Sequence, residues 1–393
     1  MLSAHNRSAS LKTPHISSIR SRICCSNSPV KHFPLHQQPI PSSRHLSSSP
    51  YRMSFPSRIS AITISKTGDF DVIEKTEVPF PKSEPGHVLV KTSYGGVNFI
   101  DTYYRKGLYP IKTFPFVVGS ESAGTIAALP ADQSVLADEE FKLREFKIGG
   151  KVAVYGPGAF AEYVSVPWDS VFPVPDAVTL NTAAAALTQG ATAITFMNEA
   201  YDVRKGDTVF VHTVAGGLGL IFAQYAKLRG ATVIGTTSTE AKAAIARAHG
   251  ADHVILYPVE DTVQRTLEIT NGEGVNVVFD GVGKDTFEND FKILRRKGTL
   301  VSVGNASGAV PPFSPLKLAE KNLRLLRPTL GNYVATPAEG RRYSTELYTL
   351  IAQGALKINV HREYPFTAEG VQQAQKDLTG GKTTGKLVIK IAD

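Results

Sequence analysis

The spacing of apolar residues changes once along the chain, near position 182. From residue 58 to residue 181 the apolar residues come in short runs rich in Val and Ile, and Gly and Pro separate these runs. Such runs predict short strands joined by turns, so we expect a barrel-like β domain here. The more charged stretch 129–148 interrupts the pattern and predicts a surface insertion.

From residue 182 onward, apolar runs alternate with segments of helical spacing. The alternation predicts the helices 182–200, 240–249, 261–270 and 284–295 and the strands 207–213, 231–236, 253–256, 275–279 and 299–303. Repeated strand–helix–strand units indicate a parallel, doubly wound sheet, so the expected fold class is α/β.

The regularity ends after Pro311-Pro312. Two helices, 338–353 and 366–378, and a final strand, 386–390, are still expected there, and we expect this tail to return to the first domain. The predicted organisation is a leader at 1–52, a β domain formed by 58–183 with 328–393, and a dinucleotide-binding domain at 184–327.

A glycine-rich stretch, Val214-Ala-Gly-Gly-Leu-Gly219, lies between the strand 207–213 and an apolar helical pattern that closes at Gly230. This context is typical of the unit that binds a dinucleotide. Gly216 lets the backbone approach a pyrophosphate, and Gly219 lets the helix pack closely on the strand. The helix N-terminus offers free N–H groups to the phosphates. Val214 takes the place of the first glycine of the usual pattern.

The residues after the second strand of this unit predict which nicotinamide cofactor is bound. Enzymes that use NAD usually carry an acid about 20 residues past the glycines, where it binds the ribose 2′-hydroxyl. Here residues 235–239 are Gly and hydroxyl residues, the first acid is Glu240, and Lys242 follows. Hydroxyls and an ammonium favour a 2′-phosphate, so we predict NADPH, with Ser238, Lys242 and Tyr257 around the phosphate. Lys242 alone would also fit a solvated lysine in the first turn of a helix.

The net charge of +8 comes from the start of the chain. Eight of the 43 basic residues precede position 60, and the first of the 35 acidic residues is Asp69. The remaining chain is formally neutral, which gives little support to nucleic-acid binding. A basic, Ser-rich and acid-free leader is typical of a transit peptide, so we expect mitochondrial import, with cleavage near Arg44. Met53 could start a cytosolic form.

Cysteine usage and apolar run lengths exclude further classes. Both cysteines, Cys24 and Cys25, lie in the leader, so the remaining chain has neither disulfides nor a Cys-ligated metal. No run of about 18 apolar residues occurs, so we predict no membrane span.

Four motifs beyond the glycine stretch resemble those of zeta-crystallin type quinone oxidoreductases, within the medium-chain dehydrogenase/reductase superfamily. The resemblance extends over about 59–391. The motifs are Gly96-Val-Asn-Phe-Ile-Asp-Thr-Tyr103 with Gly107-Leu-Tyr-Pro110, Gly206-Asp207 with Gln224 and Lys227, Val303-Gly-Asn-Ala-Ser-Gly308, and Arg327-Pro328.

The resemblance implies a GroES-like β domain beside a Rossmann domain and a substrate site between them. It implies catalytic roles for Asn98, Tyr103 and Tyr109, and NADPH as the cofactor. The implied cofactor-binding residues are Asn98, Tyr103, Thr192, Gly216, Gly217, Leu218, Gly219, Ser238, Lys242, Tyr257, Val303, Gly304 and Asn305. Taken singly, the tyrosines also fit half-buried aromatic residues.

Zinc-dependent members of the superfamily carry a Gly-His-Glu motif and cysteine ligands. This chain has Gly119-Ser-Glu121 instead, with Asn98 at the position of the first cysteine, so we predict a member without zinc. Without a Lewis acid a conjugated acceptor is the easier substrate, so the expected partner is a small quinone or enone. Glu121 and His212 are interpreted as structural.

Three further hypotheses are compatible with the sequence. A mitochondrial NADPH-dependent enoyl-thioester reductase would use Tyr109 as its proton donor, but the motif that ends at Tyr103 fits quinone reductases better. Binding of AU-rich RNA is a hypothesis of another class, because some zeta-crystallins bind such RNA. The resemblance also implies a homodimer.

Overall fold

The computed structural model describes residues 55–392. The predictions about the leader at 1–52, about Cys24 and Cys25, about cleavage near Arg44 and about a second start at Met53 fall outside the described residues. Among residues 55–392, no helix is both long and apolar enough to cross a membrane.

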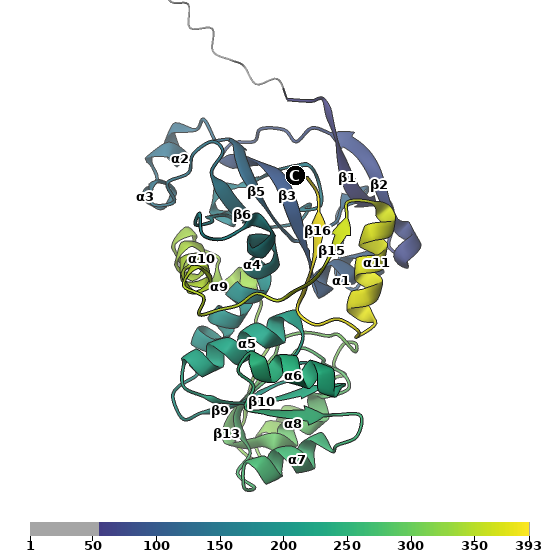
Figure 1. Ribbon diagram of the computed structural model, residues 1–393, viewed down its shortest axis with the longest axis vertical. Coiled ribbons are helices and arrows are strands. Elements are labelled where there is room, and N and C mark those ends of the chain that lie inside the picture. The colour runs from purple at the N-terminus through teal and green to yellow at the C-terminus, as the bar shows by residue number, and fades with distance from the viewer. Residues whose placement is uncertain (1–54, 393) are drawn as a thin grey trace, which may run out of the picture. The chain divides into compact units, whose positions relative to one another are not determined.

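The first lobe, here called the β lobe, contains two sheets (Figure 1). A three-stranded sheet has the order β2-β1-β4, and a seven-stranded sheet has the order β15-β16-β3-β5-β6-β8, with β7 paired to β3. The strands are β1 (Arg58–Ile64), β2 (Ile73–Pro79), β3 (His87–Val97), β4 (Phe116–Val117), β5 (Glu121–Ala128), β6 (Lys151–Tyr155), β7 (Tyr163–Pro167), β8 (Val171–Pro173), β15 (Val360–Pro365) and β16 (Lys386–Lys390). The final strand β16 pairs antiparallel with β3, so the end of the chain joins the first lobe.

The second lobe, here called the nucleotide lobe, is built on six parallel strands in the order β11-β10-β9-β12-β13-β14. They are β9 (Thr208–Val211), β10 (Thr232–Thr237), β11 (His253–Leu256), β12 (Val275–Asp280), β13 (Leu294–Ser302) and β14 (Arg324–Leu326). Alternate strand residues enter two separate apolar clusters: Val209 and Val211 belong to one, and Phe210 belongs to the other. The sheet is therefore buried on both faces, as a parallel sheet requires.

Helices cover both faces of this sheet: α5 and α6 lie on one side, and α7 and α8 lie on the other (Figure 1). The α/β fold class, with a barrel-like GroES-like domain and a doubly wound Rossmann domain, is confirmed. The α-helices are α1 (Phe99–Lys106), α2 (Gln133–Ala137), α3 (Glu139–Lys142), α4 (Leu180–Thr195), α5 (Gly217–Leu228), α6 (Glu240–Ala248), α7 (Thr262–Ile269), α8 (Phe287–Ile293), α9 (Leu330–Tyr333), α10 (Pro337–Ala352) and α11 (Ala368–Thr379).

The stretch 58–181 is not all strand, because helix α1 interrupts it. Asn98 and Asp101 form a capping box at the start of α1, with the Asn98 N–H donating to Asp101 Oδ2 over 2.8 Å. Gly107 ends the helix in the left-handed conformation, with φ of 77°. The helix is only eight residues long and polar on one side, so the apolar pattern did not reveal it. The strands β14 and β15 were likewise not predicted.

Candidate functional site

The glycine turn joins β9 to α5 and leaves no room for side chains at its base. A Cβ atom on Gly219 would lie 2.7 Å from Val214 Cα and 2.8 Å from its carbonyl carbon, so α5 starts in direct contact with the end of the strand. Gly216 is the N-cap of α5, and its N–H donates to Thr213 O over 2.8 Å. The N–H groups of Gly217 and Leu218, in the first turn of α5, and the positive end of the helix dipole lie at this turn, as an anionic ligand requires.

Val214 fits its unusual position because a second glycine makes room for it. A Cβ on Gly235, in the neighbouring strand β10, would collide with the side chain of Val214. Val214 is fully buried there, and its N–H donates to Thr236 O over 3.0 Å. The missing first glycine is thus compensated by Gly235.

Helix α4 presents polar atoms beside this turn. Gln189 lies against Gly217, where a Cβ would contact the Gln189 amide. Within the described residues, Gln189 Oε1 and Thr188 Oγ1 are buried and lack a hydrogen-bond partner. Thr192, one turn further along the helix, is also buried, and its hydroxyl donates to Thr188 O over 2.7 Å. Buried polar atoms normally have partners, so this face of α4 fits a polar ligand such as a dinucleotide.

The residues predicted around a 2′-phosphate surround the carboxyl end of β10. Ser238 is half-buried directly after the strand, and Lys242 follows in the first turn of α6. Tyr257 is 52% exposed, and its N–H donates to Thr237 O over 3.2 Å. Loss of hydration lowers the pKa of the Lys242 ammonium below its usual value. This group of side chains contains hydroxyls and a cation but no carboxylate.

A loop of the β lobe that was not predicted, Gly380–Gly385, reaches the glycine turn. The Gly385 N–H donates to Ala215 O over 3.1 Å, and Gly385 forms an isolated bridge with Gly216. Lys242 Nζ donates to Gly381 O in the same loop. Gly381 and Gly385 both have positive φ, and two such glycines in six residues are the signal that could have indicated a turn with a special path.

A buried ammonium lies at the junction of β3, α1, β5 and β16. Lys386 is 1% exposed, and its Nζ donates to Asn98 Oδ1 over 2.7 Å and to Glu121 Oε1. Asn98 Nδ2 donates to Glu121 Oε1 over 2.8 Å, and Glu121 Oε2 accepts from the Thr188 N–H over 2.7 Å. We call Asn98, Glu121 and Lys386 the Lys386 cluster. Glu121 is structural, as expected, because it connects four elements.

Gly96 and Asp101 lie directly beside the Lys386 cluster. A Cβ on Gly96 would collide with the Glu121 carboxylate and with Ala184 O, so only glycine fits at that position. Asp101 is also fully buried behind Asn98, and burial raises the pKa of its carboxyl to about 7. The carboxyl therefore exchanges its proton near neutral pH.

Tyr103 and Asn305 meet between the two lobes. The Asn305 N–H donates to the Tyr103 hydroxyl oxygen over 3.1 Å, although 202 residues separate them. Tyr109 packs edge-on against Tyr103, with ring centroids 5.4 Å apart. Burial raises the pKa of the Tyr103 hydroxyl, so this group keeps its proton at neutral pH. A hydroxyl that accepts from Asn305 can still donate that proton to a substrate oxygen.

Backbone hydrogen bonds hold the segment around Asn305. The N–H groups of Val303 and Gly304 donate to Asp280 O over 2.6 and 3.1 Å. Arg327 Nη1 donates to Ser302 O over 2.9 Å and to Val303 O over 2.8 Å, and this positioning role was not expected for Arg327.

The structure thus groups the predicted residues in three places. Tyr103, Tyr109, Val303, Gly304 and Asn305 meet between the lobes. Gly216–Gly219 form the turn, and Thr192 lies on helix α4. Ser238 and Lys242 follow β10, and Tyr257 follows β11 and bonds to the end of β10. Asn98 differs from the expectation in one respect, because its amide already bonds to Glu121 and Lys386. The individual roles of these residues stay predictions.

Two family models match the chain. Residues 84–176 match "Alcohol dehydrogenase GroES-like domain", and residues 217–347 match "Zinc-binding dehydrogenase".

Curated relatives match over most of their length. A probable quinone oxidoreductase of Schizosaccharomyces pombe is 39% identical over 330 residues, which cover 84% of this chain and 96% of the relative. Quinone oxidoreductase 1 of Escherichia coli is 35% identical over 84% of this chain and 98% of its own length.

Solved structures of quinone oxidoreductases also match this chain over most of their length. The quinone oxidoreductase of Pseudomonas syringae matches with a TM-score of 0.79 and 34% identity, over 84% of this chain and 99% of that one. The Escherichia coli quinone oxidoreductase complexed with NADPH matches with a TM-score of 0.77, 34% identity and the same coverage.

Proposed function

The chain belongs to the quinone oxidoreductases of the medium-chain dehydrogenase/reductase superfamily, and from this premise we propose that it reduces quinones or related conjugated carbonyls with NADPH. NADPH supplies a hydride, or its two electrons, to the acceptor. One proton is then required for each hydride to complete a hydroquinone.

The observation that carries the cofactor assignment is the group of side chains at the end of β10. A 2′-phosphate needs donors and positive charge, and Ser238 and Lys242 provide both, while the Glu240 carboxylate between them in the sequence pairs with Arg247. The polar atoms of Thr188 and Gln189 that lack partners among the described residues, together with the close-packed Gly219, fit the rest of a dinucleotide.

Proton donation and stabilisation of negative charge on the acceptor are assigned to Tyr103 and the Lys386 cluster. Tyr103 is held by Asn305 and can donate its proton toward an acceptor oxygen. Lys386 fixes Asn98, which caps the short helix that carries Tyr103, and supplies a buried positive charge behind it. A fixed charge in a water-poor site stabilises developing negative charge more than it would in water. Tyr109 packs against Tyr103 at the substrate side.

One matched family model is described as "Zinc-binding dehydrogenase", which raises the question of whether the residues of this chain fit a zinc ion. Asn98 and Glu121 hold the positions where zinc members carry a ligand and a motif glutamate. Both side chains bond to the Lys386 ammonium, which repels a cation and cannot ligate it. The residues do not fit a zinc ion, and we propose catalysis without metal.

The cofactor assignment predicts different behaviour of NADPH and NADH. We expect the wild-type chain to bind NADPH in preference to NADH. Lys242→Ala should weaken NADPH binding by about 10- to 100-fold, because a hydrogen bond to a charged group contributes that much to affinity. NADH binding should change little. Fluorescence titration of both nucleotides measures this.

Lys292→Ala is the matched control, because Lys292 is exposed on α8, on the opposite face of the sheet. Equal affinity of the wild type for the two nucleotides would contradict the assignment. NADPH binding without turnover of any ortho- or para-quinone would contradict the proposed activity while leaving the cofactor intact.

Three further proposals concern the location of the protein, its assembly and RNA binding. The composition of the leader supports import into mitochondria, which a fluorescent fusion with and without residues 1–52 would test. The family supports a homodimer, which light scattering would test. The chain after residue 60 is formally neutral, which disfavours RNA binding, and RNA affinity that persists without residues 1–52 would contradict this. The relatives do not favour the enoyl-thioester alternative.

A further inference from the structure

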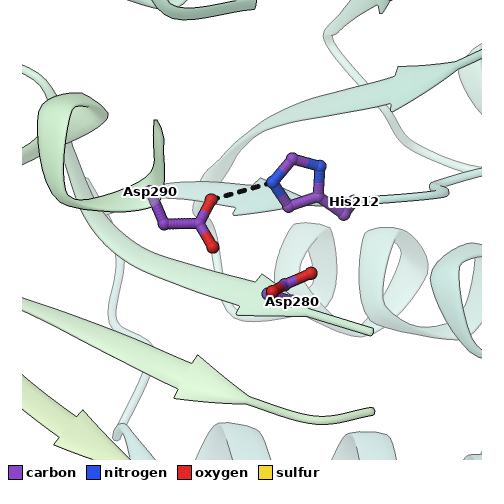
Figure 2. Close-up of side chains that lie close together, drawn as sticks. All are labelled: His212, Asp280 and Asp290. Atoms are coloured by element: carbon purple, nitrogen blue, oxygen red, sulfur yellow. Dashed lines mark hydrogen bonds and ion pairs between the residues drawn. The ribbon is translucent and has the colours of Figure 1, made fainter. Parts of the chain in front are cut away.

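Three titratable side chains form a fully buried group inside the nucleotide lobe (Figure 2). His212 follows β9, Asp280 ends β12, and Asp290 lies on α8. One ring nitrogen of His212 and one carboxylate oxygen of each aspartate all lie within 4.8 Å of one another, and each residue is at most 7% exposed. We call His212, Asp280 and Asp290 the buried triad. The proposed reaction gives it no role.

Hydrogen bonds determine which contacts the triad already has. His212 Nε2 lies 2.9 Å from Asp290 Oδ1, and His212 Nδ1 lies 3.2 Å from Thr236 Oγ1. Asp290 Oδ2 points toward Asp280 in Figure 2, and among the described residues it has no hydrogen-bond partner. The free oxygen of the Asp290 carboxylate, facing a second carboxylate, can therefore accept a proton.

The triad contacts both cofactor-binding segments through the backbone. His212 directly precedes the glycine turn, and Thr236 Oγ1, which faces its ring, also accepts the N–H of Thr213 over 3.3 Å. The Asp280 carboxylate accepts the N–H groups of Val282 and Gly283. The Asp280 backbone carbonyl accepts those of Val303 and Gly304.

The charges of the triad are balanced only in part. Among residues 55–392, the charged groups that act on His212 are Asp290 and Asp280, and those that act on Asp290 are His212 and Asp280. Burial raises the pKa of Asp290 to about 7, and the Asp290 carboxylate raises the pKa of His212 despite burial. One imidazolium facing two carboxylates leaves a net negative charge, so the group gains a proton readily near neutral pH.

We propose that the buried triad takes up a proton when NADPH binds. This inference rests on the proposed function, because NADPH brings its phosphates to the glycine turn, four residues from His212. Added negative charge at the turn favours the protonated form of a nearby buried group. By linkage, NADPH affinity then decreases as the pH rises through the range where the triad titrates.

Isothermal titration calorimetry counts this proton. NADPH is titrated into the full chain at pH 7 in buffers of different ionisation enthalpy, for wild type, Asp290→Asn and Asp285→Asn. Asp285 is the matched control, because it is an exposed aspartate five residues earlier. We expect wild type and Asp285→Asn to take up roughly 0.3–0.5 proton more than Asp290→Asn. The 2′-phosphate itself titrates at about pH 6, and its contribution cancels in this difference.

Equal proton counts in wild type and Asp290→Asn would overturn the inference while leaving NADPH binding in place. Absence of NADPH binding in the wild type would instead overturn the proposed function, and the inference with it. If Asp290→Asn fails to fold by circular dichroism, His212→Gln takes its place in the same comparison. A ratio of wild-type to Asp290→Asn affinity that stays constant between about pH 6 and pH 8.5 would also overturn the inference.

Discussion

Lys386→Met is expected to destabilise the protein by about 3–5 kcal/mol, because it leaves the Glu121 carboxylate buried without its cation. Glu121 is fully buried, and Asn98 also loses the ammonium that its Oδ1 accepts from. We expect kcat/KM for quinone reduction to fall by about 10- to 100-fold, the value of one charged hydrogen bond. Urea unfolding and steady-state kinetics measure the two effects.

The double variant Lys386→Met with Glu121→Gln separates stability from catalysis. Removing both charges leaves no unpaired ion, so most of the lost stability should return. The kcat/KM should stay low, because the positive charge behind Asn98 is still missing. Full recovery of kcat/KM would show that Lys386 acts only through stability. A single variant within about 1 kcal/mol of wild type would contradict the assigned role of the cluster.

Gly219→Ala is expected to weaken NADPH binding by about 10- to 100-fold and to cost about 1–3 kcal/mol of stability, which is typical of overpacking. The added Cβ would meet backbone atoms of Val214, which cannot move without displacing the turn. The N–H groups at the start of α5 would then no longer point to the pyrophosphate. Calorimetric NADPH titration and thermal unfolding measure both effects.

Gly156→Ala is the matched control, because a Cβ there meets no atom within 4 Å. We expect its unfolding free energy to lie within about 0.5 kcal/mol of the wild type and its NADPH affinity to be unchanged. If Gly219→Ala behaved like this control, the close approach of α5 to β9 would not be what positions the cofactor.

The sequence predicted the nucleotide lobe well because its signals are local. Strand 253–256 was predicted with the bounds it has, and the glycine turn lies between β9 and α5 as expected. Apolar periodicity and glycine positions depend on residues that are close in the sequence, so a single sequence is enough to recognise them.

Other features depend on contacts between distant residues and could not be predicted. Lys386 resembles an exposed residue at the start of a strand, and only the meeting of β16 with Asn98 and Glu121 buries it. His212 was interpreted as a core histidine, and it is buried, but its partner Asp290 lies 78 residues away. Helix α1 was missed because a capping box, and not apolar spacing, defines it.

The central claim is tested most directly by the oxidation of NADPH at 340 nm by the full chain, with a panel of ortho- and para-quinones and with NADH in parallel. The account predicts NADPH oxidation that requires a quinone, yields one hydroquinone per NADPH, exceeds the NADH rate and persists in the presence of a metal chelator. Absence of turnover with every quinone, or equal rates with NADH, would contradict it.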